Sequence, residues 1–202
     1  MPSVTRPRRG DDTSGLPPAQ QHVLEVVEGL LAEGHTFTEL SIGRIADAAG
    51  MGRSTFYGHF PDKPALLVRL AGVVVGDALG LARDWVAAPA HTRAGLVDTL
   101  TELVAEHRRH VHLIRAVTEV AGYEPTVEAF WRAQIDGFAA VARERLERDG
   151  TASGLEAETA ATMLAWGTER AIALHVERRP EADDPAFATA LAGRIWAALG
   201  RD

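Results

Sequence analysis

Cysteine is absent from the 202 residues of this chain. Without a thiol the chain can form neither a disulfide nor a thiolate metal site, and its cysteine usage gives no sign of secretion. Lysine is almost absent too: Lys63 is the one lysine, and arginine supplies the rest of the Lys and Arg total. Acidic residues outnumber basic ones by 28 to 21, and the net charge of −7 argues against a general electrostatic affinity for nucleic acid.

Targeting segments are also lacking. The N-terminal residues include arginines but no apolar stretch of the kind that signal peptides contain. No apolar run approaches the roughly 20 residues that cross a bilayer as a helix. Hydrophobic residues make up 46% of the sequence, which is enough for a sizeable core in one compact unit or two small ones. We therefore expect a soluble, cytoplasmic protein without a membrane partner.

Sustained strand-like alternation of apolar and polar residues is not found in the sequence. Residues 1–18 are aperiodic and contain proline, glycine and arginine, which predicts a flexible arm. From Ala19 apolar residues recur at three- and four-residue spacings up to a stop at Gly34, and helical patterns continue beyond it. The predicted fold class is all-α, with further helices expected at residues 42–49, 53–59, 63–87, 92–107, 111–120, 125–149, 156–178 and 184–199.

The segment SIGRIADAAGMGRSTFYGHF, residues 41–60, has the features of a helix-turn-helix. Two short helices that cross closely need a small residue at the crossing, and Ala46 supplies it four residues before the turn. The turn needs a residue that tolerates positive φ, and Gly50 meets that need. Phe56 and Phe60 are four residues apart and share one face of the third helix, so we expect them to anchor it to its neighbours.

The opposite side of that helix carries the side chains that we expect to meet DNA. Arg53 can reach guanine edges, and the small Ser54 and Gly58 allow close approach to the floor of the groove. Hydroxyl and ring donors can hold phosphate oxygens, and free N–H groups at helix N-termini favour an anion. The candidate DNA-binding residues are Ser41, Arg44, Arg53, Ser54, Thr55, Tyr57, Gly58, His59 and Lys63.

The same spacing also fits two short helices that merely pack on one another, so the identification depends on a combination of residues. That combination consists of Ala46, Gly50, Thr55, Phe56, Tyr57, His59, Phe60 and Lys63. It resembles the DNA-binding domain of the TetR family of bacterial transcriptional repressors, over about residues 19–67. The resemblance implies that residues 53–59 enter the major groove, with Tyr57, His59 and Lys63 on phosphates. We accordingly assign residues 19–66 to a three-helix DNA-binding domain.

Residues 67–202 resemble the family more loosely, and in length and helix order they are closest to the branch that contains the ethionamide-resistance repressor. The resemblance implies a larger helical domain for ligand binding and dimerisation. Apolar residues at helical spacing, such as Trp131, Ile135 and Phe138, are either ordinary core residues or the wall of a cavity between helices. The candidate cavity residues are Trp85, Leu100, Leu103, Trp131, Gln134, Ile135, Phe138, Met163, Trp166 and Glu169.

The last two expected helices are rich in alanine and glycine. Small side chains permit close approach of helices, although alanine is also the best helix former, so composition alone decides nothing. In the family the final two helices of each subunit form a four-helix dimer interface, and the resemblance therefore implies a homodimer. A two-fold dimer suits a palindromic operator, because its two reading helices must lie about 34–36 Å apart on the DNA.

Catalytic and metal-binding constellations are not evident in the sequence. His107, His110 and His112 do not share one helical face and are interpreted as a solvated helix end. The arginines at positions 6, 8 and 9 either belong to a solvated tail or enter a minor groove. We expect no cofactor, and the predicted function is that of a homodimeric repressor of double-stranded DNA controlled by a small hydrophobic effector. The alternative is an all-α small-molecule carrier or enzyme in which the helix-turn-helix only packs.

Overall fold

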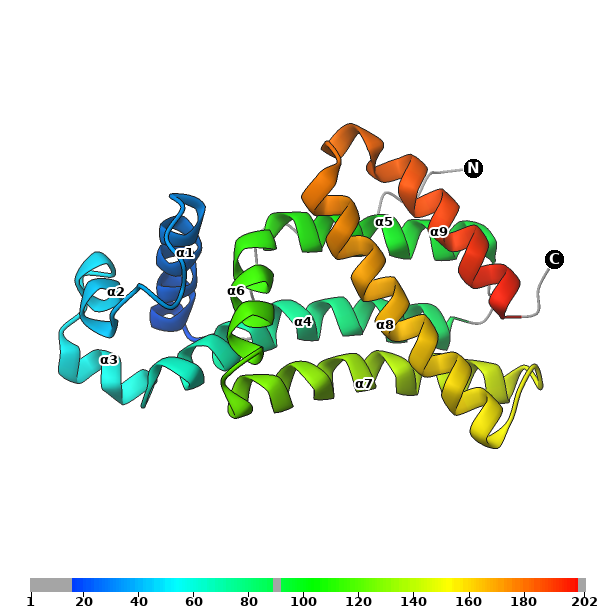
Figure 1. Ribbon diagram of the computed structural model, residues 1–202, viewed down its shortest axis with the longest axis horizontal. Coiled ribbons are helices and arrows are strands. Elements are labelled where there is room, and N and C mark those ends of the chain that lie inside the picture. The colour runs from blue at the N-terminus through cyan, green and yellow to red at the C-terminus, as the bar shows by residue number, and fades with distance from the viewer. Residues whose placement is uncertain (1–15, 89–91, 200–202) are drawn as a thin grey trace, which may run out of the picture.

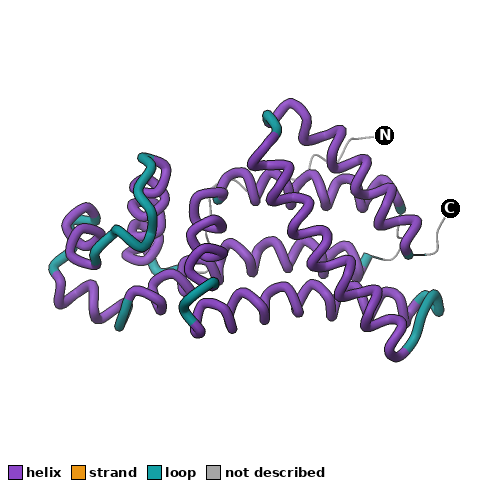
Figure 2. The backbone as a smooth tube through the Cα atoms, in the orientation of Figure 1, coloured by secondary structure: helices purple, strands orange, loops and turns teal. Residues whose placement is uncertain are grey.

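The computed structural model describes residues 16–88 and 92–199, which form helices and loops without a strand (Figure 1). The predicted all-α class is confirmed. Figure 2 shows the loops as short connections between the helices. Of the expected arm, residues 1–15 lie outside the described part, whereas Leu16 is buried and Pro18 begins the first helix. The elements are α1 (Pro18–Ala32), α2 (Ile42–Ala48), α3 (Arg53–His59), α4 (Lys63–Ala87), α5 (Arg93–Arg109), α6 (Val111–Ala121), α7 (Pro125–Arg148), α8 (Gly154–Arg178), the 3-10 turn η1 (Glu181–Asp183) and α9 (Asp184–Ala198).

Helix boundaries follow from side chains that satisfy free backbone groups. Ser41 accepts a hydrogen bond from the backbone N–H of Arg44 at 3.1 Å and so caps α2. Asp62 caps the long helix α4 in the same way. Gly50 follows α2 with a φ of 60°, which side chains with a Cβ rarely adopt. These local signals explain why the expected helices lie close to their observed positions, whereas η1 was not expected.

We call α1–α3 the head, which lies at the left of Figure 1, and α5–α9 the body. The third helix is held to the head by Phe56 and Phe60, which are 0% and 1% exposed. Their ring centroids lie 5.2 Å apart, and α1 contributes Val23 and Val27 to the same apolar cluster. Full burial of a phenylalanine stabilises a fold by about 2–3 kcal/mol. The predicted anchoring of α3 by the two rings is confirmed.

The helix α4 belongs to both parts of the molecule. Leu66, Leu67 and Leu70 pack in the core of the head, and the same apolar cluster continues into α6 and α7. By length and composition α4 is the one helix among residues 16–88 and 92–199 that could cross a membrane, although no apolar run of that kind was expected. Its buried side chains face α5, α6 and α7, so α4 has the character of a core helix of a soluble protein.

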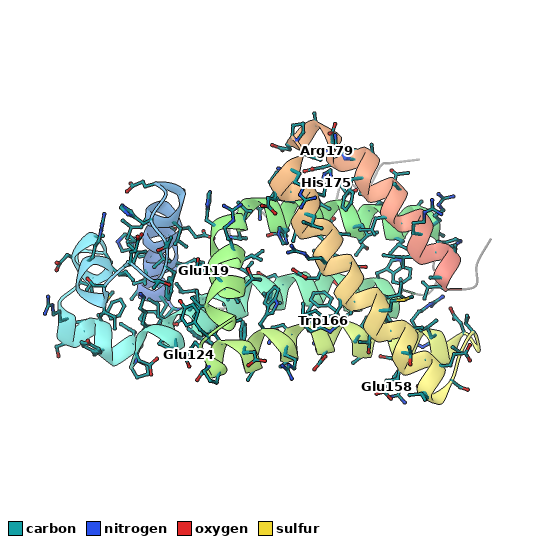
Figure 3. All side chains as sticks on the ribbon, viewed as in Figure 1. Glu119, Glu124, Glu158, Trp166, His175 and Arg179 are labelled. Carbon is teal, nitrogen blue, oxygen red and sulfur yellow. The ribbon has the colours of Figure 1, made fainter. Side chains whose placement is uncertain are left out.

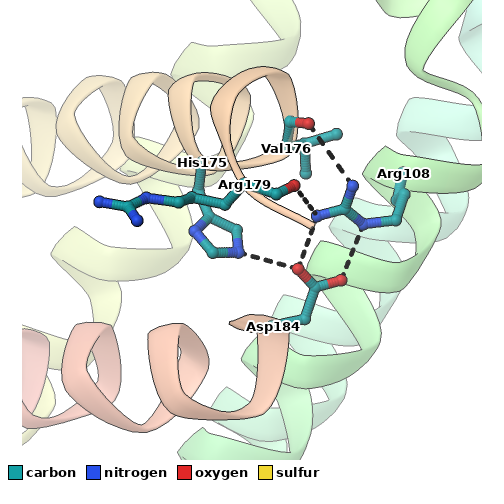
Figure 4. A network of polar contacts seen from close by, with 5 residues as sticks. All are labelled: Arg108, His175, Val176, Arg179 and Asp184. Atoms are coloured by element: carbon teal, nitrogen blue, oxygen red, sulfur yellow. Dashed lines mark hydrogen bonds and ion pairs between the residues drawn. The ribbon is translucent and has the colours of Figure 1, made fainter. Parts of the chain in front are cut away.

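A polar network joins three helices of the body (Figure 4). Arg108 of α5 donates two hydrogen bonds to the carboxylate of Asp184, at 2.8 and 2.6 Å, and His175 of α8 lies 2.8 Å from the same carboxylate. Arg108 also donates to the carbonyl groups of Val176 and Arg179, which end α8 without partners in the helix. These bonds lower the pKa of Asp184, with Arg108 as the main cause. The network fixes α8 and α9 against α5.

Candidate DNA interface and ligand cavity

The outer side of α3 is polar and exposed. The helix has only seven residues, and burial of Phe56 on one side turns the other side to solvent. Tyr57 is 51% exposed, so its hydroxyl is free to meet a ligand outside the chain. The candidate residues of α3 are therefore exposed, with one exception. The exposed residues are Arg53, Ser54, Thr55, Tyr57 and Gly58, and His59 is half-buried.

The second helix places two further candidates beside α3. The guanidinium of Arg53 lies against the backbone of α2, where a Cβ at Gly43 would come within 2.9 Å of Nη2. Gly43 thus leaves room for an arginine that can also extend towards a base edge. Ser41 is exposed at the start of α2, and Nη2 of Arg44 lies 2.7 Å from Nε2 of His35. The three candidates consequently lie around the N-terminal half of α2.

Lys63 lies at the first turn of α4. Its ammonium group donates to the carbonyl of Thr38 at 2.9 Å and lies 4.9 Å from the centre of the Phe37 ring. Burial lowers the pKa of Lys63. An ammonium has three N–H donors, so others remain for a phosphate. The hydroxyl of Thr38 also lies 2.6 Å from that of Tyr123, which follows α6, so this loop of the head contacts the body.

An apolar cavity lies inside the body. Its volume is about 1170 Å³ with the open mouth included. Its walls come from α4, α5, α7 and α8, with smaller contributions from α6 and α9. The expected cavity residues that line it are Trp85, Leu100, Leu103, Trp131, Ile135, Phe138 and Glu169.

Three expected cavity residues, Gln134, Met163 and Trp166, do not line it. Met163 is 68% and Trp166 38% exposed on the outer side of α8, the helix on which Figure 3 labels Trp166. Successive helical residues are rotated by about 100°, so positions next to a cavity stripe point elsewhere. The prediction for Met163 and Trp166 was wrong because it took large apolar side chains to face the interior of the protein. The cavity face of α8 instead consists of Leu164, Ala165, Thr168, Glu169 and Ile172.

Helix α4 forms a wall that sequence reasoning missed apart from Trp85. The missed residues recur at three- and four-residue spacing along the helix, so their periodicity could have identified them. The sequence predicts a helix over residues 63–87 and places only Trp85 of it among the candidate cavity residues. The missed α4 residues are Val74, Val75, Ala78, Ala82 and Val86.

His107 also lines the cavity, although the sequence predicted a solvated helix end. The cause is tertiary, because the side chain of His107 on α5 faces the cavity that α4, α7 and α8 enclose. Burial, with a smaller effect from the charge of Arg108, lowers the pKa of His107 to about 4. Burial also raises the pKa of Glu169, and the charge of Arg170 opposes that rise. At neutral pH the imidazole of His107 is therefore uncharged.

The other charged side chains on the cavity wall have partners. Arg145 is 1% exposed, lies 2.6 Å from the carboxylate of Asp149 and has its guanidinium carbon 5.7 Å from the centre of the Trp85 ring. Glu106 accepts a hydrogen bond of 2.7 Å from Arg109. Pairing compensates the cost of taking these charges out of water.

The corner between α5 and α6 connects the cavity wall to the head. Glu106 lies 3.8 Å from Nε2 of His110, whose Nδ1 lies 2.6 Å from the carboxylate of Glu28 in α1. His110 is 8% exposed, so it too departs from the expected solvated helix end. Within the described ranges, no group of three His, Cys, Asp or Glu side chains is arranged to hold a metal ion.

The outer side of α8 leaves large apolar side chains in solvent. Leu155 is 78% exposed, and Met163 and Trp166 lie further along the same helix. The three positions are separated by eight and three residues, which places them on one side of an α-helix. An exposed apolar stripe of this kind commonly marks a contact with another protein surface.

Comparisons with known proteins agree with this architecture. Residues 31–70 match the family described as bacterial regulatory proteins, tetR family. The HTH-type transcriptional regulator EthR of Mycolicibacterium smegmatis is 26% identical over 171 residues, which cover 82% of this chain and 79% of that relative. A structure from Pseudomonas aeruginosa PAO1, described as a transcriptional regulator, has a TM-score of 0.73, with 18% identity over 93% of each chain.

The structure of a SmeT–triclosan complex has a TM-score of 0.72, with 17% identity over 90% of this chain and 91% of that chain. At such identities the two structures support the fold alone. The segment matched by the family begins at the end of α1 and reaches into α4, so it contains the whole helix-turn-helix. The family match, the EthR relative and the shared fold together support a DNA-binding transcriptional regulator of the TetR family.

Proposed function

We propose that this regulator is a repressor that binds a palindromic operator as a homodimer and releases it when a small hydrophobic ligand fills the cavity. TetR-family regulators bind DNA and small-molecule ligands, usually as dimers. The SmeT complex contains triclosan, which supports small-molecule binding by a protein of similar fold. The observation that carries the proposal is that α4 is one unbroken helix from the core of the head to the wall of the cavity.

In this proposal α3 enters the major groove. Arg53 extends to a guanine edge, while Ser54 and Gly58 let the helix approach the bases. Phosphate contacts fix the orientation of the helix and carry no sequence information. The phosphate-binding groups are the side chains of Ser41, Arg44, Thr55, Tyr57, His59 and Lys63.

Control of DNA binding by the ligand follows from the position of α4, which has one end in the head and the other in the cavity wall. A ligand that binds one arrangement of the cavity wall better than another shifts the population towards that arrangement. A change in the tilt of α4 moves the head directly, since Leu66, Leu67 and Leu70 anchor it there. The contact from Glu106 through His110 to Glu28 provides a second connection between wall and head. Ligand binding thereby changes the separation of the two heads in a dimer.

The dimer interface is formed by α8 and α9 of each subunit. Met163 and Trp166 supply the apolar area on α8, and their exposure in a single chain supports this assignment. Small residues such as Gly167 and Ala190 on the exposed sides of the two helices let a second pair of helices approach closely. Since Leu16 is buried in the head and Pro18 begins α1, we place the DNA-binding domain at residues 16–66 and the ligand-binding and dimerisation domain at residues 67–202, in a cytoplasmic protein.

The test begins with selection of a palindromic site from random double-stranded DNA, followed by fluorescence anisotropy titration at several salt concentrations. A specific regulator should bind the selected site about 10³-fold or more tightly than random DNA. A library of hydrophobic small molecules is then screened by the thermal shift of the protein. Compounds that stabilise it should weaken operator binding by at least about fivefold, the lower end of allosteric coupling.

The results also separate this function from its rival. A small-molecule carrier or enzyme whose helix-turn-helix only packs would bind ligands but select no DNA sequence. If every stabilising compound left operator affinity unchanged, DNA binding would stand and ligand control would be refuted.

A further inference from the structure

We propose that the cavity takes an apolar molecule that carries one basic amine, and that the Glu169 carboxyl group holds this amine. The inference rests on the proposed ligand-binding role of the cavity and adds the chemical class of its occupant. The charged groups on the cavity wall, and the partner of each, carry this inference.

Glu169 differs from the other charged side chains of the wall. Glu106 is paired with Arg109, and Arg145 lies 2.6 Å from Asp149. For Glu169 the structure gives no hydrogen bond and no ion pair to any described residue. Arg170 contributes a favourable charge at a distance, from the exposed side of the same helix. The wall therefore presents one carboxyl group whose local partner is missing.

The polar neighbours on the wall cannot provide a compensating charge. His107 has a pKa of about 4 and is uncharged at neutral pH. The hydroxyl of Thr99 donates to the carbonyl of Gly95 within its own helix. A carboxylate buried without a partner is costly, and accordingly the pKa of Glu169 is raised. A ligand ammonium within hydrogen-bonding distance would remove that cost and stabilise the charged carboxylate.

The rest of the cavity wall determines the chemistry of the part of the ligand that lies away from Glu169. Aliphatic and aromatic side chains dominate it, with rings from Trp131 and Phe138 on α7. Such a surface binds alkyl or aryl groups through burial of apolar area, and aromatic faces also attract cations. An acid of the same length would bring a second negative charge to Glu169, and an alcohol would bring no charge. The three head groups therefore form a decisive series.

The experiment measures the binding of dodecylamine, dodecanol and dodecanoic acid to the full chain at pH 7.5 by quenching of tryptophan fluorescence, with each probe below its solubility limit and, where it forms micelles, below its micelle concentration. We expect dodecylamine to bind about tenfold more tightly than dodecanol, since a charge-assisted hydrogen bond favours it. Dodecanoic acid should bind most weakly of the three. The expected order thus follows the charge of the head group.

The variant Glu169→Gln should remove most of the preference for the amine, leaving the amine and the alcohol within about threefold of each other. The matched control is Glu158→Gln, because Glu158 lies on the same helix but is exposed (Figure 3). It should retain the full preference. Equal binding of amine and alcohol to the unmodified protein, or an unchanged preference in Glu169→Gln, would overturn the inference.

A cavity-filling variant separates this failure from that of the proposed function. Ala165→Phe should abolish binding of all three probes, because Ala165 is on the wall and 8% exposed. The smaller change Ala78→Leu gives the same test if the first variant does not fold by circular dichroism. If dodecanol binds and the cavity-filling variants block its binding, but dodecylamine binds no more tightly than dodecanol, only the amine inference fails. If no probe binds, or if filling has no effect, the inference and ligand control at this cavity fail together.

Discussion

At the scale of single residues, His107 makes the stability of the protein depend on pH. Its pKa is lowered from 6.5 to about 4, so the folded chain binds fewer protons at this site than the unfolded chain between these two values. Stability therefore rises with pH across that range. The contribution of His107 is complete above about pH 6.5 and is lost as the pH falls towards 4. Glu169 acts in the opposite direction, because a raised carboxyl pKa favours the folded state at lower pH.

We predict that His107→Gln reduces this dependence. Between pH 7.5 and pH 5 the unmodified protein should lose about 2 kcal/mol more of its free energy of unfolding than the variant, since one pKa unit corresponds to about 1.4 kcal/mol. Glu169 is present in both proteins, so its opposite effect cancels in the difference. Urea unfolding at the two pH values provides the measurement. His112→Gln, at an exposed position on α6, is the control and should behave like the unmodified protein.

Equal pH dependence of His107→Gln and the unmodified protein would mean that His107 is solvated, as its sequence context first indicated. The segment EHRRHVH is rich in charged residues, which by itself indicates a solvated helix end. Burial of His107 and His110 depends on helices that lie far away in the sequence. His110 meets Glu28 across 82 residues, and no local pattern encodes that contact.

At the scale of elements, the proposed DNA contacts of α3 and the start of α4 divide into base reading and phosphate binding. We predict that Arg53→Ala weakens binding to the selected operator by about 1–3 kcal/mol and relaxes the preference at one base pair. Lys63→Ala should weaken binding to specific and random DNA alike and reduce the salt dependence by about one phosphate contact. Tyr57→Phe should act in the same sequence-independent way, through loss of one hydroxyl donor. Anisotropy titrations with operator variants and random DNA measure all three.

Arg132→Ala is the control for these variants, because Arg132 is exposed on α7 in the body. It should leave DNA binding unchanged. Should Arg53→Ala weaken specific and random DNA equally, Arg53 would be a phosphate contact and the reading role would be wrong. Melting temperatures are needed for Lys63→Ala, since this change also removes the bond to Thr38 and the contact with Phe37.

The elements also indicate how far the sequence could predict the structure. Helix positions were predictable because turns and caps such as Ser41, Gly50 and Asp62 are local. The stripe of Trp131, Ile135 and Phe138 on α7 lines the cavity, as its spacing on one face of a helix allowed. On α8 the same reasoning failed, since that helix has apolar residues on two sides. Periodicity identifies a face but does not determine whether another helix, a cavity or solvent lies against it.

At the scale of the whole molecule, the proposed dimer interface on the outer side of α8 would bring two heads together. We predict that Trp166→Arg raises the dimer dissociation constant by at least about 30-fold, because a large aromatic residue at the centre of an interface commonly carries 2 kcal/mol or more. Sedimentation over a range of concentrations measures this constant. Ala133→Arg, on the exposed side of α7, is the control and should dimerise normally.

The consequence for DNA follows from effective concentration. When one head of a dimer is bound, the second meets its half-site as an intramolecular partner, so a palindrome binds far more tightly than one half-site. In Trp166→Arg this advantage should disappear, and palindrome and half-site should bind with nearly equal affinity at protein concentrations below the dimer dissociation constant. Affinity for a single half-site should stay the same in both proteins, since Trp166 is remote from α3 (Figure 3). A Trp166→Arg protein that remains dimeric and keeps its preference for the palindrome would place the interface on another surface.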